Sequence, residues 1–557
     1  MRAFQQQSKP LAMIIVMACF ATTGAVQSPS AALGQSHREK ASERGSRSEG
    51  DLESLRARIE DHINQSRFAA ARWGVKIASL DTGKTLFEFN PRKYFYPASN
   101  CKLYSAALAL DRLGGDFRIP TSLYSTVKPD SKGVLKGDLL IYGRGDPTFA
   151  ASLNDGDYYK ALEPLASAIA AAKVKRVQGD LISDESFFRG PPFGSGWEWD
   201  DLQWYYGAEV SALSINDNSV DLMVKPGGRA GAPCKITTGP QTSFVTIINR
   251  TVTASKGTPR TLNVYRPVAE NIIYVSGRFP LDDVGYTGYV AVHNPAGMFA
   301  TVFKEVLERR GITVNGRARS VDWKYREAAP IDFDKLIEIG SVQSPPLGEI
   351  IRDTMKPSQN LYAQLLLLQV GAAAPRLKLE REQALGRPRW SNGNGGHGGA
   401  AVTAGGVLEN QTTEEAALDE LRLFLSEAGV KRGDVLLEEG SGLSKRNMVT
   451  PDATVSLLAY LARHKLADIY RDALPVAGVD GTLKNRMKGT AAASNVKAKT
   501  GTLRYVNTLS GYVTTAAGER FVFSIMLNDN YSADGAGSSR DDVDPIAVML
   551  AGFSGHS

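Results

Sequence analysis

Residues 96–113 read YPASNCKLYSAALALDRL and join a short turn to a sequence of strong helix-forming character. Alanine and leucine dominate from Leu103 onward, and Gly114 follows the last apolar residue, as is typical of a helix end. Ser99 and Lys102 are three residues apart at the predicted start of this helix. Nearly one helical turn separates them, so the lysine amine can reach the serine hydroxyl. The stretch therefore predicts a serine–lysine pair at a helix N-terminus, where the helix dipole favours negative charge.

The tetrad Ser-x-x-Lys is not specific, because it occurs three times, at Ser99, Ser125 and Ser494. Ser125 lies in an extended, strand-like run, where an offset of three directs the two side chains to opposite faces. Ser494 lies directly upstream of Lys499 and is too near to be a separate partner of that site. A serine hydroxyl needs a neighbouring base near neutral pH, so the helix start predicts Ser99 as nucleophile and Lys102 as base. A helix-capping serine beside a solvated lysine is the alternative for this tetrad alone.

Two further polar motifs follow much later in the chain. Ser358 and Asn360 directly precede an apolar run of helical character, and they present a hydroxyl and an amide at a second helix start. Lys499, Thr500 and Gly501 occur in the strand-rich end of the chain. Lysine and threonine can bind a carboxylate, and glycine lets a peptide approach the strand backbone closely. A lysine on an exposed edge strand is the alternative for this tripeptide alone.

The three motifs together are more specific than any one of them. Ser-x-x-Lys, Ser-x-Asn and Lys-Thr-Gly, in this order and on these element types, are the signature of penicillin-recognising serine enzymes. The six histidines are scattered without the paired spacing of a zinc site, so metal catalysis and a serine–histidine triad are disfavoured. Nothing in the sequence calls for a cofactor.

Composition and the N-terminus indicate an exported globular protein. The chain has 557 residues, 43% of them hydrophobic and 22% charged, which is enough for two to four domains. The net charge of +6 is mild, and no basic run is dense enough to argue for nucleic acid. Residues 1–32 have the pattern of a signal peptide, and the polar residues 33–50 suggest a flexible spacer. We therefore expect a secreted or periplasmic protein with at most peripheral membrane association.

The rest of the chain predicts an α+β catalytic domain interrupted by an insertion. Residues 51–120 and 336–557 would form its two parts, and residues 121–335 would form inserted, mostly-β domains. A glycine-rich run at about 386–406 is expected to be a mobile loop. After signal removal only Cys101 and Cys234 remain, so one disulfide is possible but not required.

The sequence resembles one family closely, the D-alanyl-D-alanine carboxypeptidase/endopeptidases with inserted domains, also called class C low-molecular-mass penicillin-binding proteins. The likeness covers most of the chain beyond Leu52 and includes these segments besides the three motifs: GRGDPT at 143–148, WEWDDL at 197–202, SALSIN at 211–216, GSGLS at 440–444 and LPVAGVDGTL at 474–483. The gap of roughly 260 residues between Ser99 and Ser358 matches the family's insertion, whereas a compact β-lactamase would have these motifs much closer. The resemblance implies a penicillin-binding, β-lactamase-like transpeptidase fold, in which an antiparallel sheet is flanked by helices.

The resemblance also implies a role for each motif residue and a set of partners. The catalytic residues would be Ser99, Lys102, Ser358 and Asn360; the substrate-binding residues would be Lys499, Thr500, Gly501 and Thr502. Backbone N–H groups of Ser99 and Thr502 would form the oxyanion hole. Substrates would be peptidoglycan peptides ending in D-alanyl-D-alanine, and β-lactams would be covalent inhibitors.

The sequence departs from the family's pattern in one supporting turn and in the greater length of the glycine-rich loop after Gln369, and it leaves alternative functions open. Glu439 stands before Gly-Ser-Gly-Leu-Ser, where such proteins often have an aspartate. A β-lactamase or esterase on the same fold is the nearest alternative. A non-catalytic wall-binding protein is an alternative of a different class. The balance between carboxypeptidase and endopeptidase activity cannot be read from these motifs.

Overall fold

The computed structural model describes residues 51–65, 67, 70–384, 411–531 and 540–557. The chain separates into two units, Met1–Arg47 and Ser48–Ser557, and all described residues belong to the second. The predicted signal peptide, spacer and glycine-rich loop therefore lie outside the described residues.

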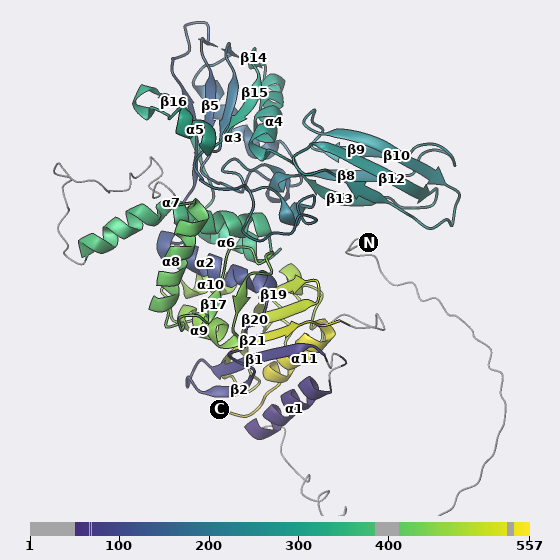
Figure 1. Ribbon diagram of the computed structural model, residues 1–557, viewed down its shortest axis with the longest axis vertical. Helices are drawn as coiled ribbons and strands as arrows, with labels where there is room; N and C mark the ends of the chain where they lie inside the picture. Colours follow the sequence, from purple (N-terminus) through teal and green to yellow (C-terminus); the bar gives the residue numbers. More distant parts are fainter. Residues whose placement is uncertain (1–50, 66, 68–69, 385–410, 532–539) are drawn as a thin grey trace, which may run out of the picture. The chain divides into compact units, whose positions relative to one another are not determined.

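A five-stranded antiparallel sheet brings the two ends of the described chain together. Its strand order is β19-β20-β21-β1-β2. The strands are β1 (Arg72–Ser79), β2 (Thr85–Phe89), β19 (Lys497–Leu503), β20 (Val506–Thr514) and β21 (Arg520–Asn528). In Figure 1 the purple strands β1 and β2 lie beside the yellow strands of the C-terminal part. The segment between β2 and β19 therefore leaves the sheet and returns to it.

Each face of this sheet is covered by helices. Along β21, the side chains of Phe521, Phe523, Ile525 and Leu527 enter one core, which includes α1 (Leu52–Asn64) and α11 (Arg540–Ala551). Val522 and Met526 point the other way, as the two-residue period of a strand requires, into a second core. The helices of the second core are α2 (Cys101–Leu113), α6 (Leu347–Met355), α7 (Asn360–Ala384), α8 (Thr413–Glu427), α9 (Pro451–Leu461) and α10 (Ala467–Ala473).

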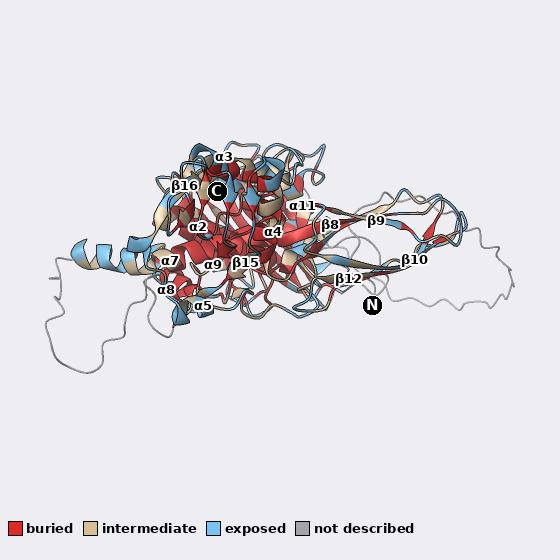
Figure 2. Ribbon diagram, turned by 90° about the horizontal axis from the view of Figure 1, so that it is seen from above, coloured by how far each residue is buried: buried red, intermediate tan, exposed pale blue. Residues whose placement is uncertain are grey.

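Helix α7 is buried mainly along its first half. Its buried residues run without a break from Asn360 to Gly371, and beyond them the helix is largely exposed (Figure 2). An apolar run of this length packs against several neighbours at once, including α2, α6 and α8. The first turn of α7 is thus held firmly in the second core.

The first part of the insertion combines parallel strands with helices. A five-stranded sheet has the order β15-β7-β5-β3-β16, and a short three-stranded sheet has the order β14-β6-β4. The elements are β3 (Pro120–Ser125), β4 (Val134–Leu135), β5 (Leu139–Tyr142), β6 (Arg176–Val177), β7 (Leu181–Asp184), β14 (Thr313–Val314), β15 (Ala318–Val321), β16 (Ile337–Gln343), α3 (Glu163–Ala171), α4 (Pro295–Arg309) and α5 (Trp323–Ala328). Because β16 pairs with β3, the inserted sheet extends beyond the predicted boundary at residue 335.

Two similar segments, KGDLLI at residues 136–141 and QGDLI at residues 178–182, stack on each other in this unit. Gly179 N donates to Gly137 O at 3.1 Å, and Gly316 N donates to Gly179 O at 3.1 Å. Strands β5, β7 and β15 continue from these three glycines in parallel. The repeated sequence therefore corresponds to a repeated, parallel structural unit within the insertion.

The second part of the insertion is made of strands. Two three-stranded sheets have the orders β13-β8-β9 and β10-β12-β11. The strands are β8 (Ser219–Lys225), β9 (Lys235–Gly239), β10 (Thr246–Ala254), β11 (Asn263–Tyr265), β12 (Ile272–Pro280) and β13 (Tyr286–Ala291). A small ribbon of β17 (Val435–Leu436) and β18 (Met448–Val449) belongs to the later part of the chain.

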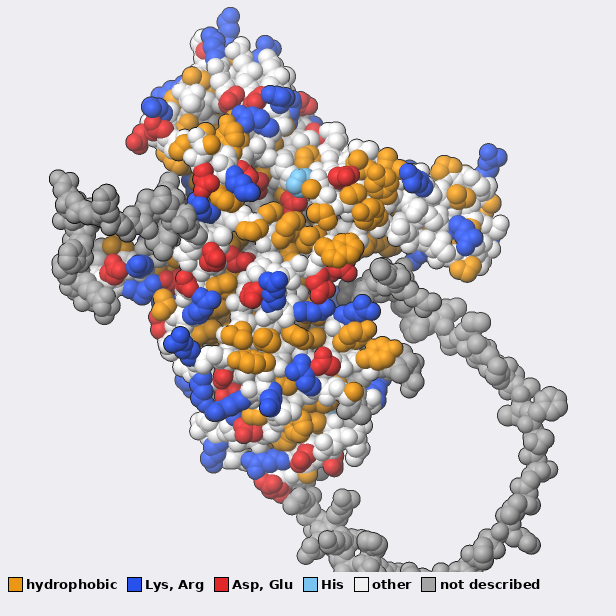
Figure 3. Space-filling model, in the orientation of Figure 1, with side chains coloured by type: hydrophobic (Ala, Val, Ile, Leu, Met, Phe, Trp, Pro, Cys, Tyr) orange, Lys and Arg blue, Asp and Glu red, His pale blue; other side chains and the backbone are white. Residues whose placement is uncertain are grey.

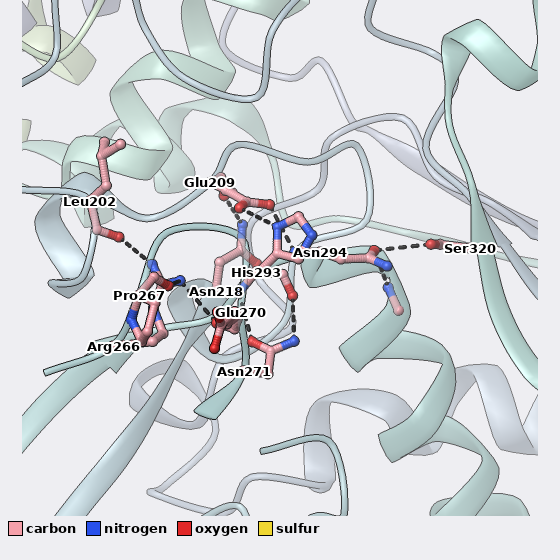
Figure 4. A network of polar contacts seen from close by, with 11 residues as sticks. Leu202, Glu209, Asn218, Arg266, Pro267, Glu270, Asn271, His293, Asn294 and Ser320 are labelled. Atoms are coloured by element: carbon pink, nitrogen blue, oxygen red, sulfur yellow. Dashed lines mark hydrogen bonds and ion pairs between the residues drawn. The ribbon is translucent and has the colours of Figure 1, made fainter. Parts of the chain in front are cut away.

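A polar network joins the two parts of the insertion (Figure 4). The buried carboxylate of Glu209 accepts from His293 Nδ1 at 2.7 Å and from Asn294 N at 2.8 Å. Asn218 Nδ2 donates to the carbonyl of Glu209 at 2.7 Å, and Asn271 bonds the backbone of His293 in both directions. These contacts fix the segment that precedes β8 against the turn between β13 and α4.

The described surface carries mixed charge. On the face seen in Figure 3, Lys and Arg side chains are interspersed with Asp and Glu rather than gathered into one field. Within the described ranges, no helix has the length and apolar character needed to cross a membrane.

Candidate active site

Ser99 lies at the start of α2, in the short 3-10 helix η1 (Ala98–Asn100). Lys102 is the second residue of α2, and the helix is buried from Cys101 to Leu110. Alanine and leucine favour this helix, and Gly114, with φ +86°, ends it. The turn before it is tight, since Ala98 has φ +47°. The nucleophile candidate is therefore held at a constrained helix start.

The Lys102 amine is completely buried among three oxygen atoms. Its Nζ lies 2.9 Å from Ser99 Oγ, 2.6 Å from Asn360 Oδ1 and 2.6 Å from the carbonyl oxygen of Ser441. A neutral amine has two N–H bonds and one lone pair. If Asn360 and Ser441 accept hydrogen bonds from the two N–H groups, the lone pair of the amine faces the Ser99 hydroxyl. This is the arrangement that removal of the hydroxyl proton requires.

Burial lowers the pKa of Lys102 to about 8, and the nearby Glu439 carboxylate opposes this shift. A lysine with this pKa is partly neutral in mildly alkaline solution. The side chain can therefore take a proton from Ser99 and later release it.

Ser358 and Asn360 lie at the start of α7, and Asn360 reaches the Lys102 amine. Ser358 has a left-handed backbone, with φ +68°, just before the helix begins at Asn360. Asn360 Nδ2 donates to the carbonyl of Tyr206 at 2.8 Å, while its Oδ1 accepts from Lys102. Tyr206 belongs to η4 (Tyr205–Gly207) in the insertion. The amide thus bonds the catalytic lysine candidate with one end and the inserted segment with the other.

Lys499 is the third residue of β19 and is completely buried. Its Nζ donates to Ser358 Oγ at 2.7 Å and to the carbonyl of Thr500 at 2.9 Å. Burial holds the pKa of Lys499 well below its usual range, and the positive charges of Lys102 and Arg486 lower it further. A negatively charged ligand, such as a carboxylate, would offset these positive charges and be bound favourably.

The other residues of the β19 motif line the same strand. Thr500 Oγ1 donates to Thr482 Oγ1 at 2.7 Å. A Cβ atom at Gly501 would lie 2.6 Å from the carbonyl oxygen of Pro97, so only glycine allows β19 to approach η1 this closely. Thr502 is exposed and pairs with Asn507 of β20. All three predicted motifs thus meet where α2, α7 and β19 begin.

The other Ser-x-x-Lys matches lie elsewhere. Ser125 is the last residue of β3 in the inserted sheet, as the extended pattern predicted. Ser494 lies in the turn before β19, where its N–H donates to the carbonyl of Ala477.

Sequence reasoning missed the backbone groups that complete the site. The carbonyls of Ser441 and Tyr206 and the hydroxyl of Thr482 each bond a motif side chain. The segments GSGLS, WEWDDL and LPVAGVDGTL, which carry the family resemblance, lie at or close to these residues and were the available signal. Cys101 and Cys234 are both buried, free thiols. No group of three or more metal-ligating side chains occurs among the residues that the structure describes.

Comparisons with known proteins identify relatives of the whole chain. The D-alanyl-D-alanine carboxypeptidase of Actinomadura sp. (strain R39) is 32% identical over 516 residues, which cover 91% of this chain and 86% of that protein. The D-alanyl-D-alanine carboxypeptidase DacB of Haemophilus influenzae is 24% identical and covers 82% of this chain and 85% of that protein.

A solved structure has the same fold. Penicillin binding protein 4 (dacB) from Haemophilus influenzae superposes with a TM-score of 0.70 at 24% identity, covering 88% of this chain and 98% of that one. The predicted α+β, penicillin-binding fold is thereby confirmed. The D-Ala-D-Ala carboxypeptidase 3 (S13) family matches residues 55–385 and 401–551. The predicted resemblance and enzyme class are confirmed as well: the chain belongs to the D-Ala-D-Ala carboxypeptidase 3 (S13) family of peptidases.

Proposed function

We propose that this chain is a serine D-Ala-D-Ala carboxypeptidase or endopeptidase that acts on peptidoglycan peptides through an acyl-enzyme on Ser99. The observation that carries the proposal is the completely buried Lys102 amine, 2.9 Å from Ser99 Oγ and bonded on its other sides by Asn360 and Ser441. Membership of the S13 family supports the same activity.

In the first step Ser99 Oγ attacks the carbonyl carbon between the two D-alanines. The Oγ–H bond breaks as Lys102 Nζ takes the proton, and the N–H groups of Ser99 and Thr502 would stabilise the oxyanion. The C–N bond then breaks as Ser358 passes its hydroxyl proton to the departing amine, and Ser358 regains a proton from Lys102, which becomes neutral again. Lys102 would next take a proton from a water molecule that attacks the acyl carbonyl. The bond between Ser99 Oγ and the carbonyl carbon would then break as Lys102 returns the proton to Oγ, which releases the acid.

The substrate's terminal carboxylate would bind at β19. Lys499 is buried and close to two other cations, Lys102 and Arg486, which supports an anionic ligand at this position. Thr500 lies next to Lys499 and offers a hydroxyl. β-Lactams carry a carboxylate and an acylating carbonyl, so they would occupy the same site as covalent inhibitors.

The substrate also sets where the protein would act. Peptidoglycan lies outside the cytoplasmic membrane, and the N-terminal signal pattern of residues 1–32 supports export. We therefore place the enzyme in the periplasm or outside the cell.

Mass spectrometry with penicillin tests the proposal. The intact protein should gain the mass of one penicillin, and the adduct should be absent from Ser99→Ala. The absence of any mass increase in wild-type protein would overturn the enzyme assignment. An adduct that forms and disappears within seconds would instead favour a β-lactamase.

Digestion of purified muropeptides distinguishes the two peptidase activities. Release of free D-alanine from pentapeptides identifies a carboxypeptidase, whereas conversion of cross-linked dimers to monomers identifies an endopeptidase. If the protein still forms the penicillin adduct but yields neither product, the proposed substrate class is wrong.

A further inference from the structure

The turn at residues 439–442 contacts α2 through three successive backbone carbonyls. The donors come from the first turns of the helix that carries the catalytic lysine candidate. The contacts are Cys101 Sγ to Glu439 O at 3.3 Å, Ser105 Oγ to Gly440 O at 2.7 Å and Lys102 Nζ to Ser441 O at 2.6 Å. The turn is therefore fixed against α2 on both sides of Lys102.

The side chain of Glu439 lies inside this turn and is completely buried. Its carboxylate accepts hydrogen bonds from five donors, which suits a negatively charged group. The donors are Ser441 N at 2.7 Å, Ser441 Oγ at 2.6 Å, Gly442 N at 2.6 Å, Trp197 Nε1 at 3.2 Å and Asn447 Nδ2 at 2.5 Å.

A single peptide group connects Glu439 to Lys102. The peptide between Ser441 and Gly442 accepts from Lys102 Nζ through its carbonyl, and it donates to Glu439 Oε1 through its N–H. A negative charge at the N–H end polarises the peptide and makes its carbonyl oxygen a stronger acceptor. The chain of two bonds therefore transmits the charge of Glu439 to the lysine amine.

The backbone of Gly442 makes this connection possible. Its φ is +86°, in the region that favours glycine, and a Cβ atom at this position would lie 1.9 Å from the carbonyl oxygen of Ala98. Only glycine fits between the two segments. The same residue thus packs the turn against η1, next to Ser99.

We propose that Glu439 is a positioning residue, which orients Lys102 and stabilises its protonated form through the peptide group between Ser441 and Gly442. This inference rests on the proposed function of Lys102 as the base. When Ser99 transfers its proton, Lys102 becomes an ammonium in a buried site, and the polarised carbonyl of Ser441 compensates the new charge. The charge of Glu439 raises the pKa of Lys102, in opposition to burial.

Three other ionisable groups act on this centre. The Cys101 thiol of α2 has a pKa raised well above its usual value by burial, so it stays neutral in neutral solution. Lys499 of β19 lies close enough to Lys102 for their charges to interact. Glu414 of α8, whose pKa burial raises to about 7, interacts with Glu439. Only Glu439 combines a charge near Lys102 with a bonded path to it.

The test is the pH dependence of acylation by a chromogenic β-lactam. In the wild-type protein the acylation rate should rise with pH as Lys102 loses its proton, with a midpoint near its pKa of about 8. Glu439→Gln removes the charge that raises this pKa, so the midpoint should move to lower pH, by about one unit. Glu439→Asp keeps the charge and should keep the midpoint.

Two control variants separate this role from a structural one. Glu414→Gln makes the same chemical exchange at a buried carboxylate of α8 and should leave the midpoint within roughly 0.3 unit, whatever its effect on melting temperature. Trp197→Phe removes one donor from the Glu439 carboxylate but keeps the charge, so the midpoint should stay or rise. The Trp197→Phe result tests the inference even if Glu439→Gln does not fold.

The inference and the proposed function fail in different ways. An unchanged midpoint in folded Glu439→Gln, an equal shift in Glu414→Gln, or a lower midpoint in Trp197→Phe would each overturn the role of Glu439. None of these results affects the penicillin adduct on wild-type Ser99, whose absence would overturn the proposed function.

Discussion

The two buried lysines of this protein lie in contrasting surroundings. Lys102, at the start of α2, is bonded to three oxygen atoms and is connected through one peptide group to Glu439. Lys499, on β19, bonds Ser358 and the carbonyl of Thr500 and lies close to two other cations. Burial lowers the pKa of both, but only Lys102 has a nearby carboxylate that opposes the shift. One environment suits a base that changes its protonation state, and the other suits a cation that awaits an anionic ligand.

Of the substitutions that test this comparison, Lys102→Ala should have the largest effect on the measured rate. Without the base, the rate of acylation by penicillin should fall by about 10³-fold or more, because the Ser99 hydroxyl keeps its proton. Stopped-flow measurement with a chromogenic β-lactam checks this. A rate within tenfold of wild type would show that another group takes the proton.

Lys499→Ala should have a smaller effect that depends on the ligand. Its kcat/KM for a peptide ending in a free D-alanine carboxylate should fall by about 10²-fold, because a buried charge pair is lost. The matched control is Lys497→Ala on the same strand, whose lysine pairs with Asp472 at 2.8 Å and should change kcat/KM by less than about twofold.

A second peptide, in which the C-terminal carboxylate is replaced by an amide, gives a sharper test of Lys499. Wild-type protein should strongly prefer the free carboxylate, and Lys499→Ala should lose most of this preference. Equal preference in both proteins would place the carboxylate at another site.

Binding of a carboxylate ligand should also be accompanied by a small uptake of protons. The pKa of Lys499 lies well below its usual range in the free protein, and a bound carboxylate should raise it. Affinity should therefore be highest when Lys499 is protonated and should fall as pH rises between the free and bound pKa values. Calorimetry of D-alanyl-D-alanine peptide binding to Ser99→Ala, in two buffers of different ionisation enthalpy, measures the uptake. A release of protons on peptide binding would contradict the proposed difference between Lys102 as a base and Lys499 as a carboxylate-binding cation.

The proximity of Ser99 and Lys102 could be predicted from the sequence, whereas the distant groups that hydrogen-bond the site could not. Ser99 and Lys102 are local neighbours on one helix, so their spacing alone places them within reach. Their distant partners, Ser441 and Tyr206, contribute backbone carbonyls, which every residue possesses. No residue type marks such an acceptor, so a pattern search does not find it. Glu439 was noticed only as a departure from aspartate, because its charge acts through a peptide group.

The fold shows the same division between local and distant signals. The sequence predicted that the end of the chain around Lys499 is rich in strands, and β19, β20 and β21 lie there. The antiparallel pairing of β16 with β3 joins residues far apart in the sequence, and neither strand encodes its partner. The insertion was expected to be mostly β, whereas its first part sets parallel strands beside α3 and α4.

The bond from Asn360 Nδ2 to the carbonyl of Tyr206 determines which way round the amide sits. The two ends of an asparagine amide have almost the same shape, and only their hydrogen-bonding partners distinguish them. A carbonyl can only accept, so Tyr206 holds the NH₂ group on its own side and leaves the oxygen facing Lys102. A shortened chain that joined residue 120 directly to residue 336 would retain all three motifs but lose the hydrogen bond between Asn360 and Tyr206. Its amide could then turn over and present NH₂ to an ammonium, donor against donor, so we expect the insertion to help set the orientation of Asn360 beside Lys102.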